Sequence, residues 1–189
     1  MSNKVRQGDY LYYSVKKRRE VIKTIIFFAI SFSLLIAGYI ATNTKANLLT
    51  IVAVLGFLPA SKSCVSMIMY LRYHGCSKEN HMLLQDTLDA FEQYAYGLVF
   101  TSYKKTYEVA GCIVKNGYIY GYLTNHTELH KDLEEHILNL VKQNGYKACV
   151  GMYTKSEDFI RRCQELSEKE TENRENDEKL MVLLHQISL

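Results

Sequence analysis

The chain is poor in the residue patterns that build metal and redox sites. Its five cysteines are odd in number, widely spaced and contain no C-x-x-C pair. This pattern excludes the usual zinc-ribbon and thioredoxin-type sites and gives no disulfide framework. We expect reduced, mostly buried thiols in a cytoplasmic domain, no catalytic nucleophile and no cofactor. The cysteines are Cys64, Cys76, Cys112, Cys149 and Cys163.

Charge is missing from a long stretch near the N-terminus. The eighteen residues from Thr24 to Ala41 carry no charge, and no acid occurs between Thr24 and Leu71. As a helix these eighteen residues would be about 27 Å long, close to the hydrocarbon thickness of a bilayer. A second apolar segment runs from Leu48 to about Leu71, after the six-residue loop 42–47. We therefore predict a two-helix transmembrane hairpin with spans at about 24–41 and 48–71.

The basic residues predict the direction of the hairpin. Seven of them precede the first span, whereas the loop has only Lys45. The positive-inside rule places the N-terminus in the cytoplasm and the loop outside, and the second span returns the chain to the cytoplasm. Both termini are therefore expected on the cytoplasmic side of the cell membrane. The seven are Lys4, Arg6, Lys16, Lys17, Arg18, Arg19 and Lys23.

The charge balance differs between the two parts of the chain. Residues 1–75 carry ten Lys and Arg against two acids, and residues 76–189 carry thirteen against eighteen, so net charges of +8 and −5 give the total of +3. Nucleic-acid binding needs a clustered positive surface. An acidic domain argues against that class of partner, and we expect the bilayer and another protein, or a second copy, instead.

The second span contains two residues that are unusual in a membrane helix. Pro59 is the only proline, and it removes a hydrogen bond from a helix interior. Lys62 follows it, and a lysine deep in the bilayer costs roughly 2.5–3.5 kcal/mol, so it is a candidate functional residue. The alternative is that Lys62 snorkels to the cytoplasmic headgroups. Because the spans contain no acidic partner, we favour snorkelling.

The run from Leu58 to Ser63 reads L-P-A-S-K-S and follows a basic N-terminus and a first span. It resembles small two-pass bacterial membrane proteins of uncharacterised function. The resemblance covers mainly the first eighty residues, and it implies the two-pass topology without implying an activity.

The remainder predicts a small α+β (α/β) domain over residues 76–166 with the order α-β-β-β-α-β-α. An Asn116-Gly117 pair between two β-type runs predicts a hairpin turn. Asn125 is expected to cap the second helix with Glu128, and Ser156 to cap the third. The polar run 167–179 is a linker or solvated helix, and the apolar tail 180–189 is expected to dock on the domain or on a partner. The expected helices are 78–96, one opened by Asn125 and ended by Gly145 with its buried face over 129–141, and one from 156 to 166; the expected strands are 98–100, 107–114, 118–123 and 147–153.

This order weakly resembles the core of restriction-endonuclease-like nucleases. That family holds Mg²⁺ with an acid on its second strand and an acid-x-Lys on its third. Here the second strand offers only Glu108, and the third has no charge. The resemblance therefore implies at most a catalytically degenerate nucleic-acid-binding domain at the membrane, which is the alternative function.

Two further groups of residues are candidates for binding. His126 and His130 lie four apart on an expected helix, with Glu134 one turn later, but H-T-E-L-H is not H-E-x-x-H, so surface histidines are expected. A row of tyrosines projects from one face of the third strand, with Tyr107 on the neighbouring strand. It could stack bases or dock a protein, but a face covered by helices is favoured. The row is Tyr118, Tyr120 and Tyr122.

These expectations together describe a protein that is not an enzyme. The sequence predicts a membrane-anchored interaction or sensing protein, with neither a catalytic residue nor a metal ligand. Its candidate structural or interaction residues are Pro59, Lys62, Tyr118, Tyr120 and Tyr122.

Overall fold

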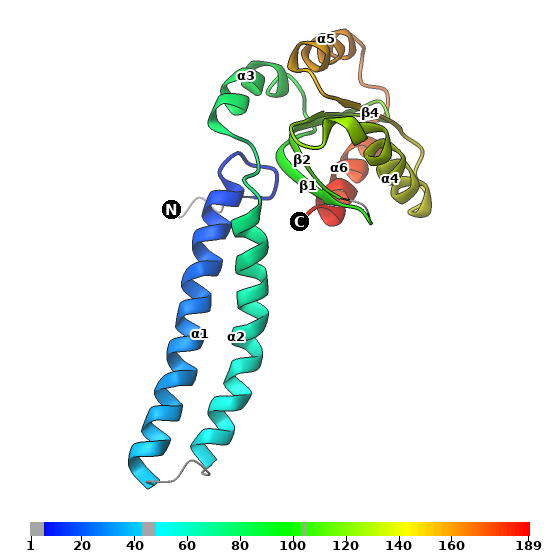
Figure 1. Cartoon of the computed structure of the whole chain (residues 1–189). Helices are drawn as coiled ribbons and strands as arrows, with labels where there is room; N and C mark the ends of the chain where they lie inside the picture. The colour runs from blue at the N-terminus through cyan, green and yellow to red at the C-terminus, as the bar shows by residue number, and fades with distance from the viewer. Residues whose placement is uncertain (1–5, 43–47, 104) are drawn as a thin grey trace. The chain divides into compact units, whose positions relative to one another are not determined.

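The computed structural model describes residues 6–42, 48–103 and 105–189. The chain divides into two compact units. The hairpin unit is Tyr13–His74, and the domain unit combines the residues up to Tyr12 with Gly75–Leu189. Two long apolar helices thus precede a small α+β domain, as the sequence predicts (Figure 1). The predicted tight loop lies almost entirely outside the described residues.

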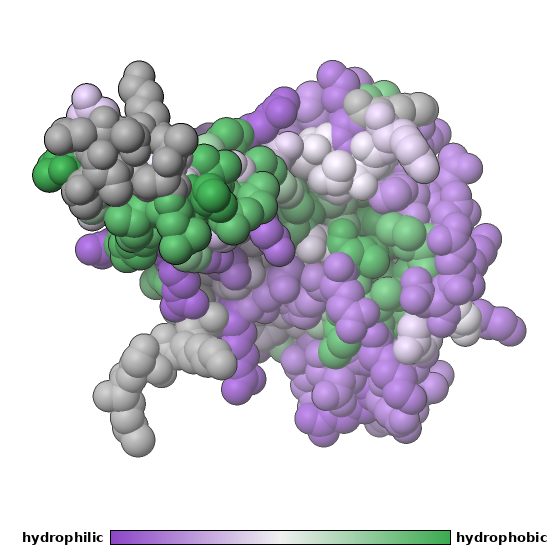
Figure 2. All heavy atoms as spheres, turned by 90° about the horizontal axis from the view of Figure 1, so that it is seen from below, coloured by the Kyte–Doolittle hydropathy of each residue, from purple (hydrophilic) through white to green (hydrophobic). Residues whose placement is uncertain are grey.

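The hairpin unit consists of two helices that expose most of their apolar surface. Helix α1 spans Tyr12–Thr42 and α2 spans Leu48–Arg72. Each contains a window hydrophobic enough to cross a membrane, and only 17% of each window is buried. Figure 2 shows the apolar side chains of this unit as a dense group, whereas polar side chains predominate on the visible face of the domain. The core helix of a soluble protein would instead be mostly buried.

Small and hydroxyl-bearing residues line the seam between α1 and α2. Thr24 Oγ1 donates to Glu20 O at 2.8 Å and lies 3.1 Å from Ser63 Oγ. A Cβ atom at Gly56 would lie only 2.7 Å from Ser31 Oγ, so glycine lets the backbones approach there. Membrane helices associate through this kind of close contact, because lipid supplies no hydrophobic force between them.

The domain unit is built on a four-stranded mixed sheet with strand order β1-β2-β3-β4. The first three strands are antiparallel and β4 is parallel to β3. A crossover helix makes the parallel pair possible. The elements are α3 Lys78–Leu88, β1 Tyr94–Thr101, β2 Thr106–Lys115, β3 Tyr118–Leu123, the 3₁₀ turn Thr127–Leu129, α4 His130–Gln143, β4 Cys149–Tyr153, α5 Ser156–Ser167 and α6 Arg174–Ile187.

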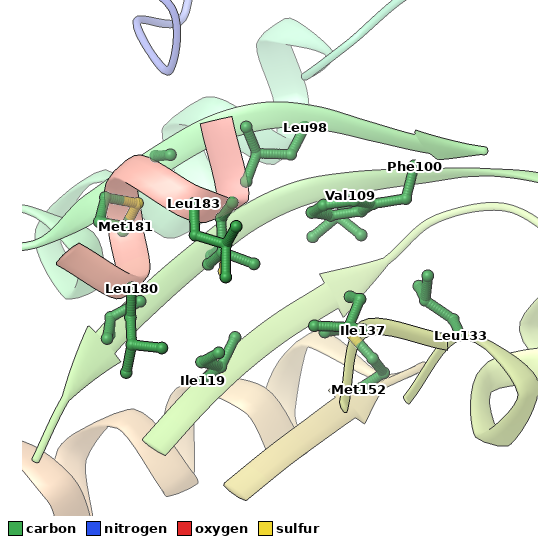
Figure 3. Packing of buried hydrophobic residues seen from close by; sticks show 14 of the residues in the cluster. Leu98, Phe100, Val109, Ile119, Leu133, Ile137, Met152, Leu180, Met181 and Leu183 are labelled. Carbon is green, nitrogen blue, oxygen red and sulfur yellow. The ribbon is translucent and has the colours of Figure 1, made fainter. Parts of the chain in front are cut away.

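Helices cover both faces of the sheet. On one face, α4 and α6 enclose the larger apolar cluster, in which side chains of all four strands meet those of both helices (Figure 3). The apolar tail supplies its α6 part, so the prediction that this tail docks is confirmed. On the other face, α3 and α5 cover a second cluster. The α6 residues in the core are Leu180, Met181, Leu183 and Leu184.

In β1 and β2 the alternation of side chains between the two faces of the sheet shifts by one residue partway along each strand. Gly97 has φ +63°, and the strand register of β2 shifts between Val109 and Gly111. A Cβ atom at Gly97 would lie 2.8 Å from the backbone nitrogen of Cys76. Gly97 therefore allows the segment that follows α2 to pack directly on the backbone of β1.

The expected helix over 78–96 is too long. Helix α3 ends at Leu88, with Asp89 as its C-cap, and Tyr94–Tyr96 begin strand β1. In β1, Tyr94 pairs with Ile113 and Tyr96 with Gly111. Pairing with β2 therefore overrides the helical spacing that the sequence suggested.

Two expected helix caps are also wrong. The side chain of Asn125 accepts from Glu108 N at 2.7 Å and donates to Thr106 O at 3.2 Å, so it ties the end of β3 to β2. The N-cap of α5 is Lys155, and Ser156 is the first helical residue. Asparagine bonds backbone groups in turns as well as at helix ends, and contacts with β2 decide the case of Asn125. For Ser156 the difference is one residue at the helix start.

Two predicted turns are confirmed. Asn116 and Gly117 have φ values of 52° and 73°, as a two-residue hairpin of the type I′ class requires. Gly145 has φ +80°, and its N–H bonds Lys142 O at 3.0 Å while Tyr146 N bonds Val141 O at 3.1 Å. This Schellman pattern ends α4.

Candidate functional site

The helix pairing in the hairpin unit fixes the level of Lys62. Thr24 and Ser63 are opposite each other, so the exposed Lys62 is level with Lys23 and Thr24, where the uncharged part of α1 begins. Pro59 lies three residues before Lys62 in α2, within an unbroken helix. The register thus places Lys62 at the edge of the uncharged section and not at its centre.

The tyrosine row lies on the face of the sheet that α5 covers. Tyr118, Tyr120 and Tyr122 are half-buried against the second cluster, and the Tyr122 ring lies 6.2 Å from that of Phe159. Tyr107 is fully buried on the opposite face, among the residues of the larger cluster. These positions match the expectation of a face covered by helices better than that of an open stacking platform.

His126 and His130 were expected on one helix, but the structure separates them. His126 has φ +47° and precedes the 3₁₀ turn, whereas His130 begins α4. Glu134 accepts from Met152 N at 2.7 Å, so its carboxylate covers the free edge of β4. Within the described ranges, no group of three His, Cys, Asp or Glu side chains is placed to hold a metal ion.

The cysteines differ in environment. Cys76, Cys112 and Cys163 are buried, and burial raises the pKa of Cys76 to about 11 and that of Cys112 to about 12. These thiols therefore stay protonated and unreactive near neutral pH. The expectation of mostly buried thiols is thus confirmed, and Cys149 is the exposed one among the five because it stands at the start of the edge strand β4.

A feature that the sequence did not reveal lies just before α1. Residues 6–11, here the N-terminal strap, run along the edge strand β1 and beside the C-terminal residues. Gly8 O accepts from Tyr96 N at 2.7 Å. The Gln7 amide donates to His185 O and to Ser188 Oγ, both at 2.9 Å. The strap thus joins β1 to the end of α6, although 178 residues of sequence separate Gln7 from His185.

Two histidines from different helices lie against this strap. The Tyr10 ring stacks on His81 of α3 at 4.0 Å, and His81 meets Tyr96 edge-on at 4.8 Å. A Cβ atom at Gly8, whose φ is +95°, would lie 2.6 Å from Cε1 of His185. Only glycine therefore fits beside His185 without a shift of the strap.

Burial controls the charge of His185. It lowers the pKa of His185, and the opposing effect of Asp9 is smaller. Among the residues that the structure describes, the buried Nδ1 atoms of His81 and His185 have no hydrogen-bond partner. The strap is consequently bordered by an imidazole that is neutral in the folded domain at neutral pH.

A second unpredicted contact fixes the β2–β3 turn. Asp177 of α6 is only 2% exposed, and its carboxylate accepts from Asn116 N at 2.7 Å and from Gly117 N at 2.9 Å. The Asn116 side chain in turn bonds Glu170 O and Glu172 N. The polar run therefore holds the turn through one buried acid, which its composition does not distinguish from its solvated neighbours.

Comparison with known proteins gives no relative from which a role could be transferred: no family model, curated protein or solved structure matches the chain.

Proposed function

We propose that the chain is a two-pass protein of the cell membrane, with its α+β domain and both termini in the cytoplasm, and that the domain has a non-enzymatic interaction or sensing role. The strap is the observation that carries the sensing part of the proposal. It continues directly into α1, which begins at Tyr12. A shift of that helix along its axis would pull on Gly8 and Gln7, which are bonded to β1 and the end of α6.

The membrane part of the proposal is supported by exposure and charge. Both hairpin helices expose large apolar side chains over most of their length. Exposure of this apolar surface to water would cost about 25 cal/mol of free energy per Å². Of the residues 13–74, only Glu20 is acidic, against eight Lys and Arg. Seven of those cations lie on one side of the two uncharged sections, which favours that side as cytoplasmic.

Topology is tested by cysteine labelling. In a cysteine-free background, a membrane-impermeant reagent should label Asn43→Cys in intact cells, and Ser2→Cys only after the cells are opened. Labelling of Ser2→Cys in intact cells would reverse the proposed orientation. Labelling of both positions in intact cells would exclude a membrane-spanning hairpin.

Sensing is tested by changing bilayer thickness. Helices adapt to thickness by tilting, so vesicles of short-chain and long-chain phosphatidylcholine should load the strap differently. We expect the amide hydrogen exchange rates of Tyr96 and Leu189, whose N–H groups bond Gly8 O and Val99 O, to change with thickness. A variant with two glycines inserted after Leu11 should lose this dependence. Equal exchange in both bilayers would contradict a sensing role.

The alternative is a degenerate nuclease-like domain that binds nucleic acid near the membrane. It rests on the resemblance of the element order alone, which is an argument from fold and not from a site. The net charge of −5 over residues 76–189 disfavours it. Binding of the full-length protein to DNA or RNA duplexes in a low-salt gel-shift assay would favour this alternative, and we expect none.

A further inference from the structure

We propose that the hairpin carries a lipid-binding collar, a ring of cations that selects anionic phospholipid headgroups. This inference rests on the proposed membrane location and goes beyond it, because a transmembrane hairpin need not prefer any headgroup. The collar consists of Lys16, Lys17, Arg18, Arg19 and Lys23 of α1 with Lys62 and Arg72 of α2.

The helix register places these seven cations at one end of the hairpin. The Thr24–Ser63 contact sets one level, and the Tyr13 and Tyr70 rings, 6.0 Å apart, set a second. Eleven residues of α1 separate Thr24 from Tyr13, which is about 16 Å along a helix. The headgroup layer on one side of a bilayer is roughly 5–8 Å thick. A collar that begins at the Thr24 level therefore extends through the whole headgroup layer.

A membrane boundary at the level of Arg72, instead of Thr24, would be energetically unfavourable. If the boundary lay at Arg72, five cations of α1 would enter the hydrocarbon. Each would add an insertion cost, and long side chains cannot all reach the headgroups when the cations follow one another over about two helical turns. The boundary therefore lies near Thr24, and Lys62 reaches it from α2.

The collar faces outward in more than one direction. Arg18, Arg19 and Lys23 are exposed on α1, with Arg19 and Lys23 on one side and Arg18 on another, and Lys62 and Arg72 are exposed on α2. The one acid of the unit, Glu20, is 7% exposed and points into the seam, where its Oε2 lies 3.6 Å from Lys23 Nζ. The outer surface at this level is therefore cationic without an acid of its own.

Tyrosines at the same end fit a layer that is both apolar and wet. Lys16 Nζ lies 5.9 Å from the centre of the Tyr70 ring, and the Arg72 guanidinium lies 5.9 Å from that of Tyr73. Tyrosine rings gather at membrane interfaces, where one end is buried and the hydroxyl remains hydrated. Phosphate oxygens of an anionic lipid are the acceptors that Arg and Lys prefer there.

The test compares two lipids in the full-length protein. The protein is reconstituted in phosphatidylcholine vesicles that contain a minor fraction of phosphatidylglycerol, and spin-labelled forms of each lipid report the motionally restricted population. We expect the restricted population to favour phosphatidylglycerol severalfold at low salt, with a weaker preference at high salt.

Matched variants assign the preference to the collar. The double variant Arg18→Gln, Arg19→Gln should reduce the preference for phosphatidylglycerol, by about fivefold at most for each cation removed. The double variant Arg18→Lys, Arg19→Lys should retain this preference. Lys131→Gln with Lys142→Gln, which removes two exposed cations from α4, should leave it unchanged. Lys62→Gln with Arg72→Gln tests α2 separately if the first pair disturbs insertion.

The outcomes separate this inference from the proposed function. Equal restriction of both lipids by the wild type, or a preference that only the α4 pair abolishes, would overturn the collar while the membrane location stands. The absence of any restricted lipid would overturn the membrane location itself.

Discussion

Loss of the Asp177 carboxylate should destabilise the domain more than loss of any exposed acid. Asp177→Ala removes two charge-assisted hydrogen bonds, at 2.7 and 2.9 Å, from the turn at Asn116 and Gly117. Such bonds contribute about 1.5–3 kcal/mol each, and an unsatisfied N–H costs about 1–3 kcal/mol where it stays buried. Both turn residues are half-buried, so water can satisfy part of the loss. We expect a decrease of about 2–4 kcal/mol in the free energy of unfolding.

Asp177→Asn refines this expectation. The amide keeps the shape of the side chain but presents one acceptor oxygen and one donor group to two N–H donors, so roughly half of the loss should remain, about 1–2 kcal/mol. Urea unfolding of the domain is followed by circular dichroism on the full-length protein in mild detergent. The midpoint should fall while the slope stays constant.

The control is Asp158→Ala, which removes an acid that is 46% exposed and paired with Arg161 on α5. Exposed pairs of this kind contribute about 0–1 kcal/mol. Hydrogen exchange should also accelerate at Asn116 and Gly117 in Asp177→Ala alone. If Asp177→Ala unfolds at the same urea concentration as Asp158→Ala, the carboxylate does not hold the turn and the reasoning is refuted.

Three other predictions concern single residues. Gly117→Val should lower the free energy of unfolding by about 1–2 kcal/mol, because φ is +73° there, whereas Gly117→Asn should be tolerated; equal urea midpoints for both would contradict the argument. Lys62→Arg should insert into the membrane like the wild type, and Lys62→Leu should shift the span without preventing insertion. Crosslinking checks assembly: if both changes abolish it while the single chain still inserts normally, Lys62 meets an acid of a partner within the bilayer. Because burial lowers the pKa of His185 from 6.5, the unfolded chain binds its proton first, so the stability that depends on the neutral imidazole is complete above pH 6.5 and declines as the pH falls below that value. Urea midpoints measured from pH 7.5 to pH 5 should fall less steeply for His185→Gln, and parallel profiles would exclude this role.

The parts of the fold that the sequence predicted are those with local signals. The tyrosines at every second position of Tyr118–Leu123 predicted strand β3 with its observed bounds, and the Asn116-Gly117 pair predicted the turn before it. The apolar spacing at Leu133, Ile137 and Val141 gave the buried face of α4. In each case the pattern and the structure it specifies lie within about ten residues of one another.

What the sequence did not predict depends on contacts between distant segments. Gln7 looks like any polar residue before a membrane span, yet its amide bonds residues 178 to 182 positions away. Asp177 stands among solvated acids and is distinguished only by its contact with the turn. Asn125 had the spacing of a helix cap, and the neighbouring strand took its hydrogen bonds instead. Of the candidate residues, Lys62 and the tyrosine row could be placed on an element, but what each contacts could not be derived.

The bond between Gln7 and Leu189 also sets an order for biosynthesis. Gln7 is made early, but its partners at the end of α6 leave the ribosome roughly 10–35 s later at about 5–20 residues per second. During that interval the strap can already bond β1 through Tyr96 N and Gly8 O, but it still lacks its partners at the end of α6. The edge of β1 at Val99 and Phe100 therefore stays unpaired until Ser188 and Leu189, which pair with it, have left the ribosome. Chaperones that bind extended segments would have their longest access to this protein at β1, and mutations that slow the closure of the strap should reduce its yield in cells even where the finished domain is stable.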